Sequence, residues 1–128
     1  MKNIEVIDTI KRINNNDGIF KRKLPVRVLF ALKKNITKLD NAVKEYNSTL
    51  STLFEQYGFN MLNVGDSDLP SELMEKTRQL LEEDIEVEIS RVPESLVLES
   101  EDNMTFSELD ALSFMLTEET EGEVTLDL

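Results

Sequence analysis

The chain has 128 residues, of which 40% are hydrophobic, and a formal net charge of −12. This size and composition fit one domain with its own core and argue against global disorder. Cysteine and histidine are both absent, which excludes disulfides, thiolate nucleophiles, Ser-His-Asp triads and zinc sites built on those side chains. We therefore expect a protein that is not an enzyme, with no catalytic residue, no cofactor and no metal site.

The first expected element is an amphipathic helix over residues 3–14, with isoleucines repeating along one side. A turn follows at residues 14–18, because Asn and Gly readily adopt the left-handed conformation that closes a helix. Pro25 favours the start of a second helix, since the N–H that proline lacks would have no partner in a first turn. Gly58 marks the end of that helix.

The second helix carries an uninterrupted heptad stripe of large side chains, spaced alternately by three and four residues. At 1.5 Å per residue, about 33 residues make a rod of roughly 50 Å, longer than a compact domain of this size needs. We predict that part of the stripe pairs with a second copy or another protein, and the core of a helical bundle is the alternative. The stripe consists of Leu29, Leu32, Ile36, Leu39, Val43, Tyr46, Leu50, Leu53 and Tyr57.

The next part of the chain mixes a helix with patterns typical of strands. A connector with a short strand at 61–64 precedes a third helix over about 67–83. Alternation of apolar and polar residues over 84–92 predicts a half-buried strand. Residues 96–98 and 124–128 show similar patterns, so both are candidates to join it in a small antiparallel sheet.

The last helix is expected over residues 106–117. Thr105 and Glu108 form the signature of a capping box, in which each residue satisfies a backbone N–H at the helix start. The fold class is therefore α+β, mainly α, with a long central helix, shorter packed helices and a small antiparallel β element. We expect a single helix-rich domain over residues 1–116 and an acidic C-terminal tail over 117–128 that has the pattern of an edge strand.

The two halves of the chain carry opposite charge. Residues 1–60 contain 11 Lys and Arg against 6 Asp and Glu, whereas residues 61–128 contain 3 against 20. The halves either attract one another within the fold or present separate surfaces to partners. The acids lack the spacing of a calcium loop, and the basic cluster over 21–38 lacks an aromatic platform, so we expect neither a metal site nor nucleic-acid binding. The predicted acidic surface consists of Glu82, Glu83, Asp84, Glu86 and Glu88.

Several segments stand in a distinctive order. They are a short first helix, the run Lys23-Leu24-Pro25-Val26-Arg27-Val28 before a long helix that ends Tyr57-Gly58, then Glu72-Leu73, Leu80-Leu81-Glu82-Glu83-Asp84-Ile85-Glu86-Val87-Glu88-Ile89 and Leu109-Asp110-Ala111-Leu112. This order resembles that of small proteins without assigned activity that are encoded by phages and prophages of Gram-positive bacteria. The resemblance covers roughly residues 4–116. It implies a phage setting and supplies no functional residues.

Our leading hypothesis is a non-enzymatic phage accessory or assembly protein that acts by protein–protein contact with a phage or host partner, including homodimer formation through the long helix. The alternative is an acidic nucleic-acid mimic that inhibits a host defence or nucleic-acid enzyme. A carboxylate enzyme and direct nucleic-acid binding rank below both. No apolar run approaches the roughly 20 residues that span a bilayer, so we expect no membrane contact and a cytoplasmic location in the bacterial host or in the virion.

Overall fold

The computed structural model describes residues 1–61, 69–98 and 104–118. The chain forms two compact units. The first unit consists of Met1–Ile7 and Leu39–Val87, and the second consists of Asp8–Lys38 and Glu88–Leu128. The organisation of residues 1–116 as a single domain stays a prediction.

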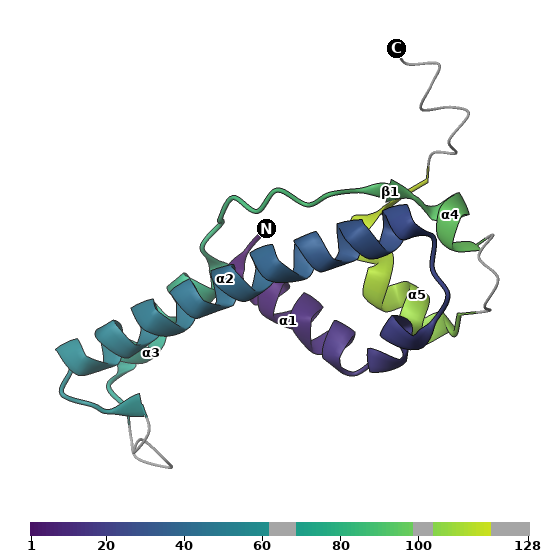
Figure 1. Ribbon diagram of the computed structural model, residues 1–128. Coiled ribbons are helices and arrows are strands. Elements are labelled where there is room, and N and C mark those ends of the chain that lie inside the picture. The colour runs from purple at the N-terminus through teal and green to yellow at the C-terminus, as the bar shows by residue number, and fades with distance from the viewer. Residues whose placement is uncertain (62–68, 99–103, 119–128) are drawn as a thin grey trace. The chain divides into compact units, whose positions relative to one another are not determined.

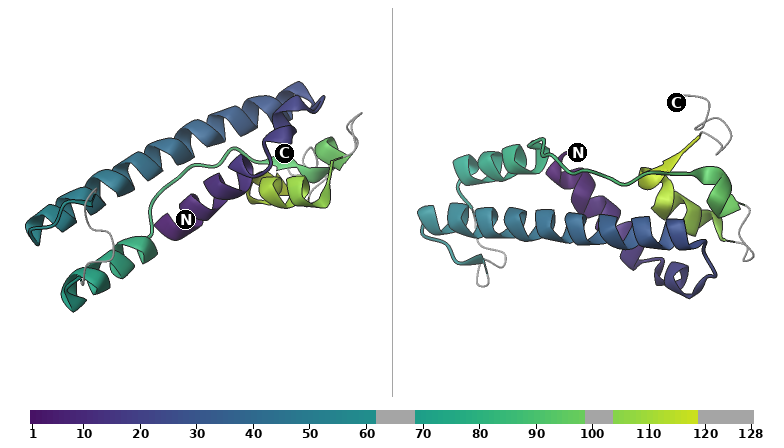
Figure 2. Two further views of the ribbon diagram at one scale, coloured as in Figure 1. Left: turned by 90° about the horizontal axis from the view of Figure 1, so that it is seen from below. Right: turned by 45° about the horizontal axis from the view of Figure 1, so that its top comes forward.

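Two helices that the sequence predicts are present with almost the expected bounds. Helix α1 spans Asn3–Asn14, and α2 spans Val26–Gln56 as one continuous helix of 31 residues (Figure 1, Figure 2). The carbonyl of Pro25 accepts a hydrogen bond from the first turn of α2, as the position of this proline predicts. Gly58 follows the end of α2 with a φ of 80°, a conformation that favours glycine. The prediction of a long central helix is confirmed.

The first unit is held together by contacts between the start of the chain and the end of α3, which spans Ser71–Glu82. Lys2 pairs with Asp84 in an isolated antiparallel bridge. The Ile85 N–H donates to the Met1 carbonyl at 2.8 Å. The Asn3 side-chain amide, which is buried, donates to the carbonyl of Leu80 at 2.8 Å. These bonds satisfy backbone groups where α3 ends, because the last carbonyls of a helix have no partner within it.

The second unit contains the short sheet. Strand β1 covers Val92–Pro93 and β2 covers Leu116–Thr117, and the two are parallel, with Val92 opposite Leu116. The expected antiparallel arrangement is therefore wrong. Parallel strands need a long crossover between them. Here the crossover contains α4 (Glu94–Leu98) and α5 (Phe106–Leu112), followed by the 3-10 turn η3 (Ser113–Met115).

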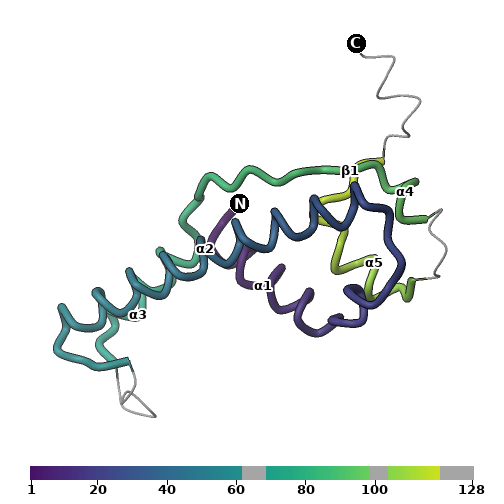
Figure 3. The backbone as a smooth tube through the Cα atoms, in the orientation of Figure 1, coloured from purple at the N-terminus to yellow at the C-terminus, as the bar shows by residue number. Residues whose placement is uncertain are grey.

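Several other predictions about strands fail. Residues 96–98 belong to α4 and form no strand. Residues 84–91 are extended, as Figure 3 shows between α3 and β1, but only Asp84 takes part in a β-bridge. The alternation of apolar and polar residues therefore correctly predicted an extended segment. The pairing of this segment in an antiparallel sheet was predicted incorrectly. The strand predicted at 61–64 lies outside the described residues except for Met61, and the pattern at 124–128 lies wholly outside them.

The core of the second unit is built on the first half of α2. The buried positions of this half are spaced by three and four residues and include Val28, Leu32 and Asn35. The 3-10 turn η1 (Asp17–Lys21), which overlaps the turn predicted at 14–18, adds Ile19 to the same core. The capping box at Thr105 is formed as predicted and starts α5. The core cluster consists of Ile19, Val28, Ala31, Leu32, Val92, Val97, Ala111, Leu112 and Met115.

Candidate functional site

The heptad stripe differs in burial along α2. Leu32 and Leu39 are completely buried, and the other seven members are half-buried. Burial raises the pKa of the Tyr46 hydroxyl above its ordinary value. The stripe is therefore partly covered by the rest of the chain, and contact of its half-buried members with another protein stays a prediction.

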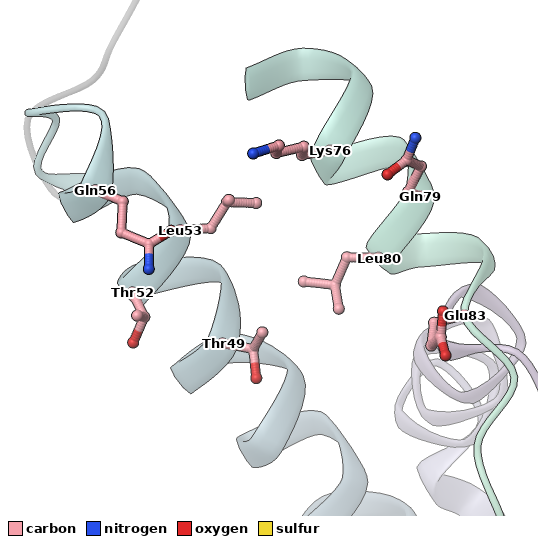
Figure 4. A pocket seen from close by; sticks show the side chains of 8 residues that line it. All are labelled: Thr49, Thr52, Leu53, Gln56, Lys76, Gln79, Leu80 and Glu83. Atoms are coloured by element: carbon pink, nitrogen blue, oxygen red, sulfur yellow. The ribbon is translucent and has the colours of Figure 1, made fainter. Parts of the chain in front are cut away.

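The second half of the stripe borders a groove in the first unit. The groove has a volume of about 320 Å³ and lies between the last turns of α2 and α3 (Figure 4). In this view Leu53 and Leu80 point toward each other from the two helices. Leu53 is the member of the predicted stripe that reaches the groove. The lining residues are Thr49, Thr52, Leu53, Gln56, Lys76, Gln79, Leu80 and Glu83.

The polar residues on the α2 side of the groove bond largely within their own helix. The hydroxyl of Thr49 donates to the carbonyl of Glu45 at 2.9 Å, and that of Thr52 donates to Ser48 at 3.1 Å. These donors are satisfied without a ligand, because a Thr hydroxyl in a helix can bond to the carbonyl four residues earlier. Leu53 and Leu80 therefore make the centre of the groove apolar.

Lys76 provides one charged end and also connects the stripe to α3. Its ammonium lies 5.3 Å from the ring centroid of Tyr57, the last stripe residue, and 3.6 Å from a carboxylate oxygen of Glu72. The pKa of Lys76 is raised, chiefly by the Tyr57 side chain and further by Glu72. Glu83 carries the opposite charge among the lining residues. The groove thus has one positive and one negative residue beside its apolar centre.

The outer surface of α3 carries a network of ion pairs. Arg78 bonds to Glu75 and, at 2.8 Å, to Glu82. Arg78 lowers the pKa of the Glu75 carboxyl, and both carboxylates raise the pKa of Arg78. All three side chains are more than half exposed, so each pair contributes little to stability. This network covers the solvent side of α3 and leaves the groove side free of it.

The predicted acidic surface is exposed at all five positions. Two of its members already have cationic partners: Glu82 pairs with Arg78, and Asp84 lies 3.3 Å from the N-terminal amine. Glu86 and Glu88 alternate with half-buried apolar residues along the extended segment. The structure therefore places these carboxylates at the surface, but it does not gather them around one point.

Asn35 makes a buried polar contact that was not predicted from the sequence. This side chain is completely buried in the second unit. Its amide donates to the carbonyl of Ser90 at 2.9 Å, and its oxygen accepts from the Ser90 N–H at 2.7 Å. Asn35 thus bonds to the extended segment as a neighbouring strand would. Its position beside Leu32 and Leu39 was the available signal, because a polar residue on a buried helix face needs a partner.

A second missed contact joins the basic and acidic parts of the chain within the second unit. The Arg22 guanidinium donates to both carboxylate oxygens of Glu108, at 2.9 and 3.3 Å. Glu108 is buried, and its hydrogen bond with Arg22 lowers the pKa of its carboxyl, with further help from Thr105. This ion pair joins a basic residue of the first half of the chain to an acidic residue of the second half, which is one of the two arrangements that the charge distribution of the sequence allows.

The described part of the chain holds neither a metal-binding cluster nor a membrane-spanning helix. Among residues 1–61, 69–98 and 104–118, no three acidic side chains come together in a group suited to hold a metal ion. In those same ranges, no helix has the length and apolar character needed to cross a bilayer. Comparisons of the chain with protein-family models, curated proteins and solved structures find no match.

Proposed function

We propose that this chain is a non-enzymatic accessory or assembly protein of a phage, and that it acts by contact with another protein through the groove between α2 and α3. The observation that carries the proposal is the open groove with Leu53 and Leu80 on its two walls. An apolar groove between helices is a common receptor for an amphipathic helix of a partner. The phage setting is supported by the order of segments in the sequence.

The partner that we infer is a second copy of the chain. Leu53 belongs both to the groove and to the heptad stripe, and a stripe with this spacing is the pattern by which helices pair. Leu50 and Tyr46, one and two turns earlier on α2, are also half-buried. Pairing along this part of α2 would therefore remove a continuous row of apolar surface from water, which favours association.

Size-exclusion chromatography with light scattering tests this proposal. The wild-type chain should show a mass above the 14.7 kDa of one copy, and the mass should rise with concentration. Leu53→Asp should return the mass to that of a monomer, because it places a carboxylate in the apolar contact. Asn47→Asp is the matched control, since it adds the same charge at an exposed position of α2 that lies outside the groove lining.

A second variant guards against loss of folding at Leu53. Thr52 is exposed and lines the groove, so Thr52→Arg should fill the groove without disturbing buried residues. Circular dichroism should show unchanged helix content for Thr52→Arg while its mass falls to that of a monomer. A wild-type chain that remains monomeric at high concentration, or a mass that neither groove variant lowers, would contradict self-association.

A second candidate function is inhibition of a host defence or nucleic-acid enzyme by an acidic surface that imitates nucleic acid. Exposure of all five predicted acidic residues favours it. Binding should weaken steeply with salt, because exposed charges are screened. The test is a pull-down from host lysate at low and high ionic strength, with generic DNA as competitor. The wild-type chain should retain a nucleic-acid enzyme that DNA displaces, and the double variant Glu86→Gln, Glu88→Gln should lose it.

The control for this pull-down is Glu55→Gln, which removes one exposed carboxylate from α2 and should leave retention unchanged. Retention of phage proteins only, or of nothing at low salt, would exclude the mimic. Retention that DNA does not displace would exclude it equally.

A further inference from the structure

The first turns of α2 carry an apolar surface that the described residues leave uncovered. Val26 is 84% exposed and Phe30 is 66% exposed, and their spacing of four residues puts them on one side of the helix. Val28 and Leu32, on the other side, are completely buried in the core of the second unit. Exposed large apolar residues that adjoin one another typically mark a contact surface.

Two cations lie on the same side of α2, one turn further along. Lys33 and Lys34 are exposed, and the Lys34 ammonium is 5.5 Å from the ring centroid of Phe30. This distance is within the range of a cation–π interaction. The prediction that the basic cluster over 21–38 lacks an aromatic platform is therefore wrong. We call Val26, Phe30, Lys33 and Lys34 the basic-apolar face of α2.

A ligand that fits this face must carry apolar side chains beside carboxylates. The chain itself contains such a segment after Glu118, in residues 119–128. This segment has no Lys or Arg, so its charge is complementary to that of the two lysines. Its carboxylates are Glu119, Glu121, Glu123 and Asp127, and its large apolar residues are Val124, Leu126 and Leu128.

The segment starts close enough to α2 to reach the face. Thr117, one residue before Glu118, pairs with Pro93 in the sheet. Ser90, three residues before Pro93, is bonded to Asn35 of α2. Ten extended residues span up to about 33 Å, whereas the basic-apolar face, from Val26 to Lys34, occupies about 12 Å of helix. All of these residues belong to the second unit.

We propose that residues 119–128 bind the basic-apolar face of α2 in the same chain. The apolar residues of the segment cover Val26 and Phe30, and its carboxylates lie beside Lys33 and Lys34. This contact is independent of the groove between α2 and α3, which belongs to the first unit.

A tryptophan reporter tests the proposal in the full-length chain, which contains no natural tryptophan. Phe30→Trp places the reporter on the basic-apolar face. Its emission should be blue-shifted and shielded from acrylamide, and should become red-shifted and accessible when Glu119, Glu121 and Glu123 are changed to Gln and Leu126 to Ser. The control reporter Phe106→Trp stands at a residue 88% exposed outside the face, so the same changes should leave its emission unaltered.

Charge provides the second arm of the experiment. In the Phe30→Trp chain, Lys33→Glu with Lys34→Glu should reproduce the red shift, because like charges repel. Lys44 is an exposed lysine of α2 outside the face, so Lys44→Glu should leave the emission unchanged. Equal emission with the natural and the substituted segment would overturn the proposal. A blue shift that appears only at high protein concentration, or only with phosphatidylserine vesicles or added DNA, would also overturn it and would assign the face to a second copy, a lipid surface or a nucleic acid.

Discussion

Replacing Asn35 with alanine should destabilise the second unit through the backbone of Ser90. Asn35 is completely buried, and its side chain bonds to both the N–H and the carbonyl of Ser90. Asn35→Ala removes both bonds at once. Because alanine has no polar atom in its side chain, the two Ser90 groups would have to find water or remain without partners in a partly buried position.

The expected cost follows from this geometry. An unsatisfied buried backbone group costs about 1–3 kcal/mol, and two groups are affected. Ser90 is half-buried, so water recovers part of that loss. Alanine also raises the free energy of unfolding by up to about 0.7 kcal/mol, because its helix propensity is higher than that of asparagine. The free energy of unfolding should therefore fall by about 2–4 kcal/mol, which lowers the urea midpoint by about 1–2 M for a chain of this size.

Urea unfolding followed by circular dichroism measures the global effect, and hydrogen exchange of the Ser90 amide measures the local one. The local measurement is needed because a chain with two compact units need not unfold in a single transition. Asn41→Ala is the matched control: Asn41 is exposed on the same helix, so its replacement should be neutral or slightly stabilising. A change below about 0.5 kcal/mol for Asn35→Ala, together with unaltered exchange at Ser90, would refute the reasoning.

Three further predictions concern local contacts. The pKa of Glu108 is lower in the folded chain, so the stability that this carboxylate contributes is present above its unfolded pKa of about 4.3 and is lost as pH falls through the folded value. Glu108→Gln should therefore be less stable than wild type at pH 7. Chemical denaturation from pH 7 to 3 should show a smaller loss of unfolding free energy for this variant than for wild type. Thr105→Ala should lower the free energy of unfolding by about 1 kcal/mol, because it removes the cap that accepts from the Glu108 N–H. Gly58→Ala should cost about 1–2 kcal/mol in a thermal melt because φ is 80°, even though no described residue other than its chain neighbours has an atom within 4 Å of the new Cβ. Gly58→Asn should cost less.

The local signals for helix ends were sufficient at both ends of α2 and at the start of α5, but they did not reveal α4 or the end of α5 at Leu112. Pro25 and Gly58 correctly bracketed α2, and Thr105 correctly marked the start of α5. Each of these signals acts on backbone groups a few residues away, so its effect does not depend on the rest of the fold. The heptad spacing also identified a helix face that is buried or half-buried throughout. It did not identify how that burial varies along the helix.

The candidate sites were less predictable because they join residues distant in sequence. The acidic residues were expected as one surface, yet Glu82 and Asp84 are engaged with Arg78 and the N-terminal amine. The groove depends on the approach of α3 to α2. Among its lining residues, Leu53 was predicted as part of the heptad stripe and Glu83 as part of the acidic surface, but the sequence did not predict that the two lie at one site. A charge or an apolar side chain in the sequence does not indicate which partner the fold brings to it.

The amino-acid sequence by itself determined that the chain is mainly helical, where α1, α2 and α5 begin, and that catalysis through cysteine or histidine is excluded. These properties follow from residue type and short-range backbone bonding. Tertiary structure alone decided that β1 and β2 are parallel, that Asn35 bonds to Ser90 and that Arg22 pairs with Glu108. Each of those contacts closes a loop of more than twenty residues, and the free energy that selects one closure comes from the packing of the whole unit.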